Sequence, residues 1–273
     1  MELKVTRYEV DDGVATLWLN RPQRLNAWTG RMHTEYRHLL EQAERDPAVR
    51  VVVVTGVGRG FCAGADTQAL EGHALRGGYD PGTPPDLAKP GYGVRPEFDA
   101  DFAFHFGLRK PVIAAVNGPA AGVGLVLACF ADLRFGVPGA KLTTAHGRLA
   151  LPAEYGLSWL LPRLIGLTAA NDLLLSSRVF LTDEALSLGL FNALYEPAEL
   201  LPQVLAYARE MARTVSPGSL AATKRQIYTD LHRDAASSVR EANALLAEMM
   251  KEPDYREAVA AWTGKRPARW TGA

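Results

Sequence analysis

Two short stretches in the first half of the chain constrain its fold more than any other feature. Each places small residues of a turn directly beside an apolar segment: Gly60–Asp66 reads GFCAGAD, and Ala114–Asp132 reads AAVNGPAAGVGLVLACFAD. A turn built from glycine and alanine lets a ligand oxygen approach backbone N–H groups closely. Two such turns in one domain can direct two N–H donors at one carbonyl oxygen, which stabilises negative charge on that oxygen. The sequence therefore predicts an oxyanion hole of the kind used in acyl or enolate chemistry.

Length and charge set the broad class of the protein. The chain has 273 residues, 48% of them hydrophobic, and a formal net charge of zero, which suits one large α/β domain or a domain with an appendage. Balanced charge argues against a nucleic-acid partner, which requires a basic face. No signal peptide is expected, and the longest apolar run, Val123–Phe130, is too short to span a membrane. We expect Cys62 and Cys129 to be reduced, buried thiols in a cytoplasmic protein.

The order of apolar runs and helical stripes predicts a strand-rich body up to about Tyr195 and a helical tail after it. A hairpin turn is expected at Asp11–Gly13, and Thr29 is placed to cap a helix that ends near Pro47. Buried strands are expected at Val51–Thr55, Val112–Val116 and Leu133–Val137, with helices at Asp99–Leu108, Val123–Cys129, Leu157–Ile165, Ala169–Leu175, Glu199–Thr214, Leu231–Lys251 and Tyr255–Trp262.

The segment Arg76–Glu97 differs from the rest of the body because it is dense in proline and glycine. A long segment without regular structure inside a compact domain is usually a binding loop, a lid or disorder. We expect this segment to be mobile without ligand and to pack over one end of the site when ligand binds.

Glu154 and His146 are the titratable residues with the best placement for chemistry. Glu154 lies between apolar stretches, where burial would raise its pKa toward the range of a useful acid or base. The plainer alternative is a surface glutamate that caps the helix beginning near Leu157. For His146 the alternative is an ordinary loop histidine, and for Cys62, which could be a nucleophile, it is a small buried thiol.

Five cationic side chains are candidates for contacts to phosphate, although an ordinary solvated charge is the commoner explanation for each. They are Arg59, Lys110, Lys141, Lys265 and Arg266.

The run VVVVTGVGRGFCAG resembles a dinucleotide-binding fingerprint but does not match it, because Phe61 stands where the third glycine should be.

Six motifs follow one another along the chain: RPQRLNAW, VVVVTGVGRGFCAGAD, KPVIAAVNGPAAGVGLVLACFAD, EYGLSWLLPRLIG, LSLGLFNALY and GKRPARW. Together they resemble the crotonase superfamily, the enoyl-CoA hydratase/isomerase family, from about Val5 to about Trp270. The resemblance implies an α/β fold in which a spiral of ββα turns bears the active site over residues 1–195. It also implies a C-terminal helical trimerisation region over residues 196–273.

The resemblance further implies an acyl-CoA substrate, with coenzyme A entering as part of the substrate and no resident cofactor or metal. The two oxyanion donors would be the backbone N–H groups of Ala65 and Val123. Apolar residues in the tail, such as Leu246 and Met250, favour a homotrimer or a dimer of trimers. Coenzyme A contacts would fall on Arg24, Leu25, Ala27, Ala63, Asp66, Gly122 and Lys265.

The chain departs from the pattern of the best-known hydratases of this family, which use two carboxylates. Val126 and His146 stand at the two positions where those carboxylates are expected. Glu154, however, matches a position that bears an essential carboxylate in isomerase, dehalogenase and carbon–carbon hydrolase members. Glu154 is therefore the expected acid/base, in an enzyme that isomerises or hydrates an acyl-CoA through an enolate.

Two other functions remain open. The first is a hydrolase that cleaves a carbon–carbon bond of a β-diketone, resembling the camphor-degrading branch of the superfamily. It would use His146 and Glu154 with water and without coenzyme A, and Trp28 would line its pocket. The second is a binding or scaffold protein that has kept the fold and lost the chemistry. Binding of coenzyme A separates the first from an acyl-CoA enzyme.

Overall fold

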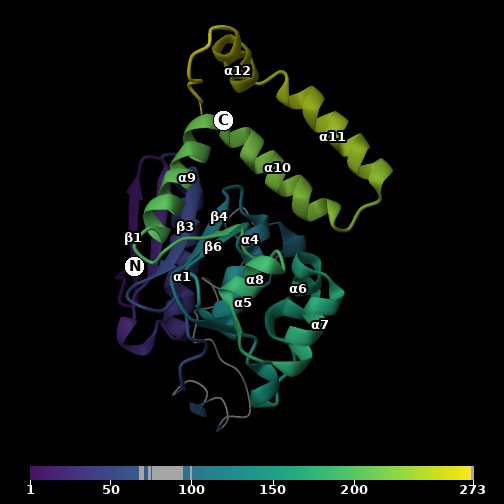
Figure 1. The fold of residues 1–273 in the computed structure, drawn as a ribbon. Helices are drawn as coiled ribbons and strands as arrows, with labels where there is room; N and C mark the ends of the chain where they lie inside the picture. Colours follow the sequence, from purple (N-terminus) through teal and green to yellow (C-terminus); the bar gives the residue numbers. More distant parts are fainter. Residues whose placement is uncertain (68–70, 73–74, 76–94, 99, 272–273) are drawn as a thin grey trace.

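The computed structural model describes residues 1–67, 71–72, 75, 95–98 and 100–271. The expected lid, residues 76–97, lies outside the described residues except for its last three positions. Within the described part, a six-stranded sheet has helices on both faces, and a pair of long helices with a third, shorter one extends away from it (Figure 1).

The main sheet has the strand order β1-β2-β3-β4-β6-β9. Only the β1–β2 hairpin is antiparallel, and it turns through Asp12 and Gly13, whose φ angles are 45° and 78°. The other neighbouring strands are parallel. The strands are β1 (Thr6–Asp11), β2 (Val14–Leu19), β3 (Val51–Gly56), β4 (Val112–Val116), β6 (Leu133–Gly136) and β9 (Ala193–Leu194).

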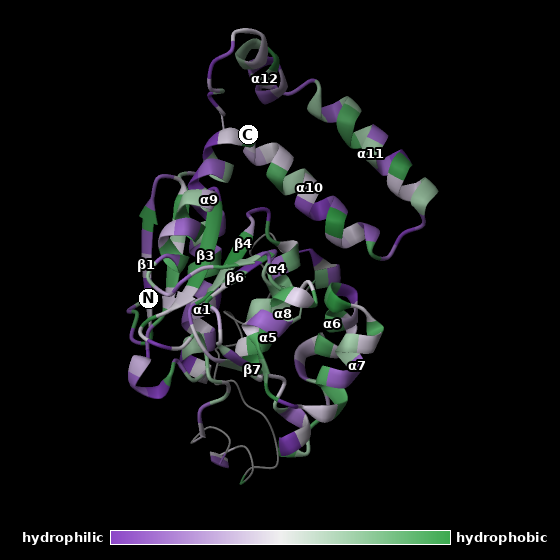
Figure 2. Cartoon of the chain, viewed as in Figure 1, coloured by the Kyte–Doolittle hydropathy of each residue, from purple (hydrophilic) through white to green (hydrophobic). Residues whose placement is uncertain are grey.

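The two faces of this sheet bury separate hydrophobic cores, because successive side chains of a strand point to opposite faces. Alternate residues such as Leu17 and Val54 join the larger core, which α1 (Gly30–Arg45) and α5 (Val123–Phe130) cover. Their neighbours, such as Val53, face α9 (Leu200–Thr214). Figure 2 shows the apolar character of β3, which is buried along its whole length.

A second, three-stranded sheet was not expected from the sequence. It has the order β5-β7-β8, with strands β5 (Ala120–Ala121), β7 (Lys141–Thr143) and β8 (Phe180–Leu181). Strands of two or three residues are too short to show an alternating pattern, which explains why sequence analysis missed them. This sheet lies next to α5 and holds the turn that begins that helix.

Most of the expected helices are present, but the one over 99–108 is largely wrong. Its described part forms only α4 (Phe104–Gly107), because Phe102 has a φ of 64°, which a right-handed helix cannot contain. The remaining short elements of the body are η1 (Pro22–Arg24), η2 (Pro96–Phe98), η3 (His146–Leu149), η4 (Glu154–Gly156), α6 (Leu157–Ile165), α7 (Leu167–Ser176) and α8 (Thr182–Ser187).

After α9 the chain forms α10 (Pro217–Asp230), α11 (Ala235–Met249) and α12 (Pro253–Thr263), which we call the helical arm. The arm extends from the body in Figure 1, and no residue of α11 is buried. Because α9 packs on the main sheet, the helical arm begins at α10.

The division of the chain at residue 195 stays a prediction. No helix in the described part is long and apolar enough to cross a membrane.

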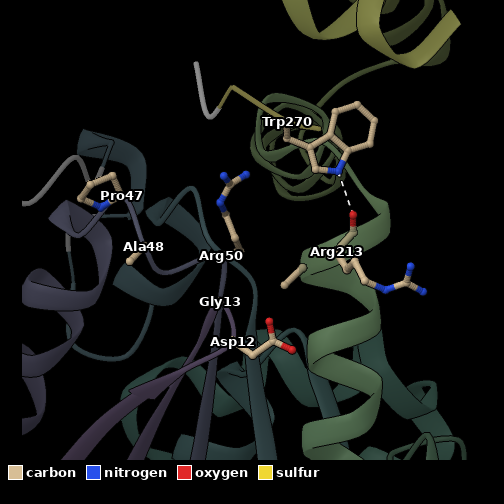
Figure 3. A pocket seen from close by; sticks show the side chains of 8 residues that line it. Asp12, Gly13, Pro47, Ala48, Arg50, Arg213 and Trp270 are labelled. Atoms are coloured by element: carbon tan, nitrogen blue, oxygen red, sulfur yellow. Dashed lines mark hydrogen bonds between the residues drawn. The ribbon is translucent and has the colours of Figure 1, made fainter. Parts of the chain in front are cut away.

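The end of the chain returns to the body beside the β1–β2 turn. The indole N–H of Trp270 donates to the carbonyl of Arg213 at 3.0 Å, as Figure 3 shows, and Thr271 bonds to Asp254. A cavity of about 270 Å³ lies between Trp270, Arg50 and the β1–β2 turn. The tail is thereby attached to the C-terminal end of α9.

A buried ion pair fastens α10 to the body. The Lys224 ammonium contacts a carboxylate oxygen of Asp132 at 2.7 Å and also donates to the carbonyl of Lys110. Tyr228, one turn further along α10, donates to the other Asp132 oxygen at 2.7 Å and stacks on Phe106. The side chains of Lys224 and Asp132 are 5% and 14% exposed.

We expect Lys224→Met to lower the free energy of unfolding by about 3 kcal/mol, because it leaves the Asp132 carboxylate largely buried without its cation. Chemical denaturation monitored by circular dichroism measures this change. Lys251→Met, at an exposed position, is the matched control and should change stability by less than about 0.5 kcal/mol. Equal effects of the two substitutions would contradict a stabilising role for the buried pair.

Candidate active site

The two small-residue turns lie against each other, as the sequence suggested. The amide of Ala121 donates to the carbonyl of Cys62 at 3.0 Å. A Cβ on Gly124 would lie 2.1 Å from the same carbonyl oxygen, so only glycine fits there. A Cβ on Gly64, whose φ is 100°, would lie 3.1 Å from the carbonyl oxygen of Ala121. The first turn of α5 and the segment after Phe61 are therefore in direct backbone contact.

The two predicted N–H donors are free at this junction. Ala65 and Trp28 form an isolated β-bridge in which the backbone groups on either side of Ala65 make the hydrogen bonds. The N–H of Trp28 donates to the carbonyl of Gly64, and the N–H of Asp66 donates to the carbonyl of Trp28. Because alternate backbone groups point to opposite sides, the N–H of Ala65 faces away from Trp28. Val123 is the first residue of α5, where amides have no partner within the helix. In the described part of the chain, neither amide has a hydrogen-bond acceptor.

Arg21 and Asn26 hold the Ala65 turn in place, and sequence analysis missed both. The Arg21 guanidinium pairs with the buried Asp66 carboxylate at 2.8 Å and donates to the carbonyl of Ala27 at 2.6 Å. The Asn26 side chain, itself fully buried, donates to the carbonyls of Val57 and Gly60. The signal was available in RPQRLNAW, where an arginine and an asparagine flank apolar residues. Asp66 is thus an anchor of the turn.

Glu154 lies over the start of α5. One of its carboxylate oxygens is 3.9 Å from the position that a Cβ on Gly122 would take, and Gly122 directly precedes Val123. The alternative that Glu154 caps a helix is wrong: Gly156 is the N-cap of α6, and no side chain caps that helix. Burial raises the pKa of Glu154 above its ordinary value of 4.5, and the charge of His146 acts in the opposite direction. These are the properties of an acid/base group.

His146 is buried beside Glu154, at 7% exposure, and its Nδ1 has no hydrogen-bond partner among the described residues. The loop that positions the pair is unusual, because Ala145, Ala150 and Tyr155 all have φ angles between 50° and 60°. Such left-handed conformations cost free energy in residues other than glycine and tend to cluster at functional sites.

An aromatic row connects the two halves of the site. Tyr155 packs edge-on against Phe102 with ring centroids 5.0 Å apart, and Phe102 lies 5.6 Å from Trp28. Trp28 is 4% exposed, and its indole N–H has no partner in the described part. The row therefore runs from the turn that holds Ala65 to the turn that holds Glu154.

The structure brings together most of the residues that the resemblance assigned to coenzyme A. The carbonyl of Leu25 accepts from the amide of Ala63 at 3.0 Å, which places the Arg24–Ala27 loop beside the Gly60–Asp66 turn. Lys265 is the exception, because in a single chain it lies away from the other residues assigned to coenzyme A. It follows α12, which lies at the far end of the arm from α5 in Figure 1.

Other sequence candidates have structural explanations. Burial raises the pKa of the Cys62 thiol to about 12, which argues against a nucleophile, and both cysteines are free and buried. Lys110 donates to two carbonyls at the end of α1, and Arg266 pairs with Glu257. No cluster of potential metal ligands is present among the described residues.

Comparison with known proteins shows the family of the chain. The model of the enoyl-CoA hydratase/isomerase family matches residues 9–273. A 1,2-epoxyphenylacetyl-CoA isomerase of Escherichia coli is 34% identical over 266 residues, covering 96% of this chain and 97% of that protein. The crystal structure of a probable enoyl-CoA hydratase/isomerase from Mycobacterium abscessus superposes with a TM-score of 0.85 at 33% identity, covering 98% of this chain and 99% of that one.

The chain belongs to the enoyl-CoA hydratase/isomerase family. An enoyl-CoA hydratase from Mycobacterium tuberculosis has the same fold, with a TM-score of 0.83 at 26% identity over 98% of this chain and 99% of that one. The crotonase fold with its C-terminal helical region is thereby confirmed, and the chain is an enzyme of this hydratase/isomerase family.

The raised pKa of Glu154 makes a prediction about stability. A carboxyl whose pKa is higher in the folded state stabilises that state while it is protonated, and this contribution is lost as pH rises through the shifted pKa. Glu154→Gln should therefore raise the melting temperature at pH values above the shifted pKa, because glutamine removes the charge whose burial costs stability. The gain should vanish below the ordinary pKa of 4.5. Thermal scans of both proteins from pH 4 to pH 8 measure it, and a less stable variant at pH 7 would contradict burial as the dominant effect.

Proposed function

We propose that this enzyme binds acyl-CoA thioesters and moves a proton next to the thioester carbonyl through an enolate. The observation that supports this most directly is the position of Glu154 over Gly122, beside the amide of Val123, which has no acceptor within the described part of the chain. The Glu154 carboxylate, which can carry a proton, and the Val123 N–H, which can donate to an oxyanion, are then both within reach of one thioester group. Coenzyme A takes part as a portion of the substrate.

In this mechanism the thioester oxygen accepts hydrogen bonds from the N–H groups of Ala65 and Val123. Removal of a proton from the neighbouring carbon places negative charge on that oxygen. One donor of this type lowers the barrier by about 2.7–4 kcal/mol in comparable sites. The carboxylate of Glu154 accepts the proton and returns it to the same carbon or to another one. The Arg21–Asp66 pair keeps the Ala65 amide oriented.

Isomerisation fits the site better than hydration does. Val126, on the third residue after the Val123 donor, is 1% exposed and apolar, so no second carboxylate stands on that turn of α5. A single acid/base can transfer a proton between two carbons, whereas adding water across a double bond requires both activation of water and protonation of carbon. The E. coli relative is named an isomerase of a CoA thioester.

One observation favours a second candidate, a hydrolase that cleaves a carbon–carbon bond in a β-diketone. His146 is buried beside Glu154, and its Nδ1 has no hydrogen-bond partner among the residues that the structure describes, which suits a base that activates water. In that reaction coenzyme A would not be required.

We expect Glu154→Gln to lower kcat by roughly 10²–10⁴-fold with little change in the Kd for an acyl-CoA, because glutamine keeps the shape and removes the proton carrier. Turnover of a panel of enoyl-CoA esters and calorimetric binding measure the two quantities. A variant that retains more than about a tenth of the wild-type rate would remove Glu154 from the mechanism.

His146→Ala separates the two candidates. In acyl-CoA chemistry the imidazole only shapes the pocket, and the substitution should cost less than about tenfold in kcat, well short of the loss of an acid/base. In diketone hydrolysis the loss should equal that of Glu154→Gln. The same two variants are assayed against both substrate panels, and inactivity of the wild type towards both would favour a binding protein.

We also propose that the helical arm associates with further copies of the chain, as a trimer or a dimer of trimers. Leu246 and Val239 on α11 are each 59% exposed, and Trp262 on α12 is 87% exposed. Apolar side chains gathered on α11, which has no buried residue, and on the neighbouring α12 indicate a surface that a partner covers. Analytical ultracentrifugation at micromolar concentration should show no stable monomer, and Leu246→Glu should dissociate the assembly, whereas Lys251→Glu should not.

A further inference from the structure

A second cavity, of about 710 Å³, opens at the carboxyl ends of the parallel strands β2, β3, β4 and β6. It is lined by the turns that follow three of these strands, by Trp18 at the end of β2 and by the start of α9. Its volume is typical of sites for small organic molecules. In open parallel sheets, ligands commonly bind at this edge.

This cavity is distinct from the candidate active site. Trp18 alternates with Leu17 and Leu19 on β2, whose side chains enter the core that also contains Trp28 and Val123. Trp18 therefore points to the opposite face of the sheet, where Leu200 of α9 lies. Neither Glu154 nor His146 lines the cavity, so it lacks the acid/base group of the site described above.

The cavity walls are held by hydrogen bonds within the protein. The Asn117 side chain donates to the carbonyls of Gly56 and Gly58 at 2.9 Å each and accepts from the amide of Gly56 at 3.0 Å, which fixes two turns to each other. On the opposite wall, Thr182 donates to the carbonyl of Val137, and its hydroxyl accepts from the amide of Ala140. A cavity supported in this way is preformed, so a ligand does not have to order it.

Two charged side chains line the cavity, and both are positive. Arg59 and Lys141, two of the five cations selected from the sequence as candidates for phosphate contacts, both line it, although 82 positions separate them. No acidic residue lines the cavity, and within the described part of the chain neither cation has an ion-pair partner. The nearby Asp183 carboxylate accepts from the backbone amide of Gly139 instead. The remaining lining contains Trp18, Val137, Leu200 and Leu201, which are apolar.

We propose that this cavity binds an amphipathic organic anion, with its carboxylate or phosphate between Arg59 and Lys141 and its apolar body against Trp18, Leu200 and Leu201. The two cations supply charge-assisted hydrogen bonds, and the apolar wall supplies burial of a hydrocarbon or aromatic group. The site is separate from acyl-CoA turnover, so it stands or falls independently of the proposed function.

Isothermal titration calorimetry with octanoate and with octyl phosphate tests the site and distinguishes the two acid groups. One of them should bind saturably at one molecule per chain, and uncharged octanol should bind at least about tenfold more weakly, as expected from the loss of charge-assisted hydrogen bonds. Arg59→Gln and Lys141→Gln should each weaken binding about tenfold. Lys251→Gln, an exposed cation away from the cavity, should leave binding unchanged.

Two further measurements locate the ligand. Binding should change the tryptophan fluorescence of the wild type, and Trp18→Phe should abolish that change. Saturating coenzyme A should leave the affinity for the probe unchanged. The proposal is wrong if neither anion binds at millimolar concentration, if the glutamine variants bind as tightly as the wild type, or if coenzyme A displaces the probe, which would place it in the candidate active site.

Discussion

The contact between Gly124 and the carbonyl of Cys62 is the constraint on which the candidate site depends. A β-carbon at position 124 would lie 2.1 Å from that oxygen, so any other residue would push α5 away from the Gly60–Asp66 turn. The amides of Ala65 and Val123 belong to the two sides of this contact. The convergence on one substrate oxygen that we propose for them requires the two backbones to touch, which explains the small residues in both turns.

Backbone atoms make good oxyanion donors only when something else fixes their direction, because a loop without support would rotate them away. Here polar side chains provide the support from behind. Arg21 joins Asp66 to the carbonyl of Ala27, and Asn26 bonds to Gly60. Asn117 bonds to Gly56 at the end of β3 and to Gly58 after it. Each of these polar side chains is hydrogen-bonded within the protein and fixes the direction of the turn that it contacts. The backbone amides of Ala65 and Val123 are then left for a ligand.

The sequence predicted the parallel strands and the capped first helix because both depend on local patterns. The small residues of the two turns indicated in addition that their backbones can approach one ligand atom. The sequence could not predict the second sheet, since strands such as Ala120–Ala121 are too short to show the alternation of apolar and polar residues that marks a strand. It also predicted helix through Phe102, whose positive φ is set by packing against Trp28 and Tyr155. The alternative roles of Glu154 could be separated only in three dimensions, where Gly156 occupies the cap and the carboxylate turns toward Gly122.

The two faces of the main sheet impose opposite conditions on charge at the same carboxyl edge. On the face of α5, the Glu154 carboxylate is held in partial burial, which raises its pKa above the ordinary value. On the face of α9, Arg59 and Lys141 are exposed to solvent and stand over an apolar wall. Proton transfer needs a group that water solvates poorly, whereas recognition of an anion needs cations that stay charged. A twisted parallel sheet can meet both needs because its loops supply separate surroundings on each side.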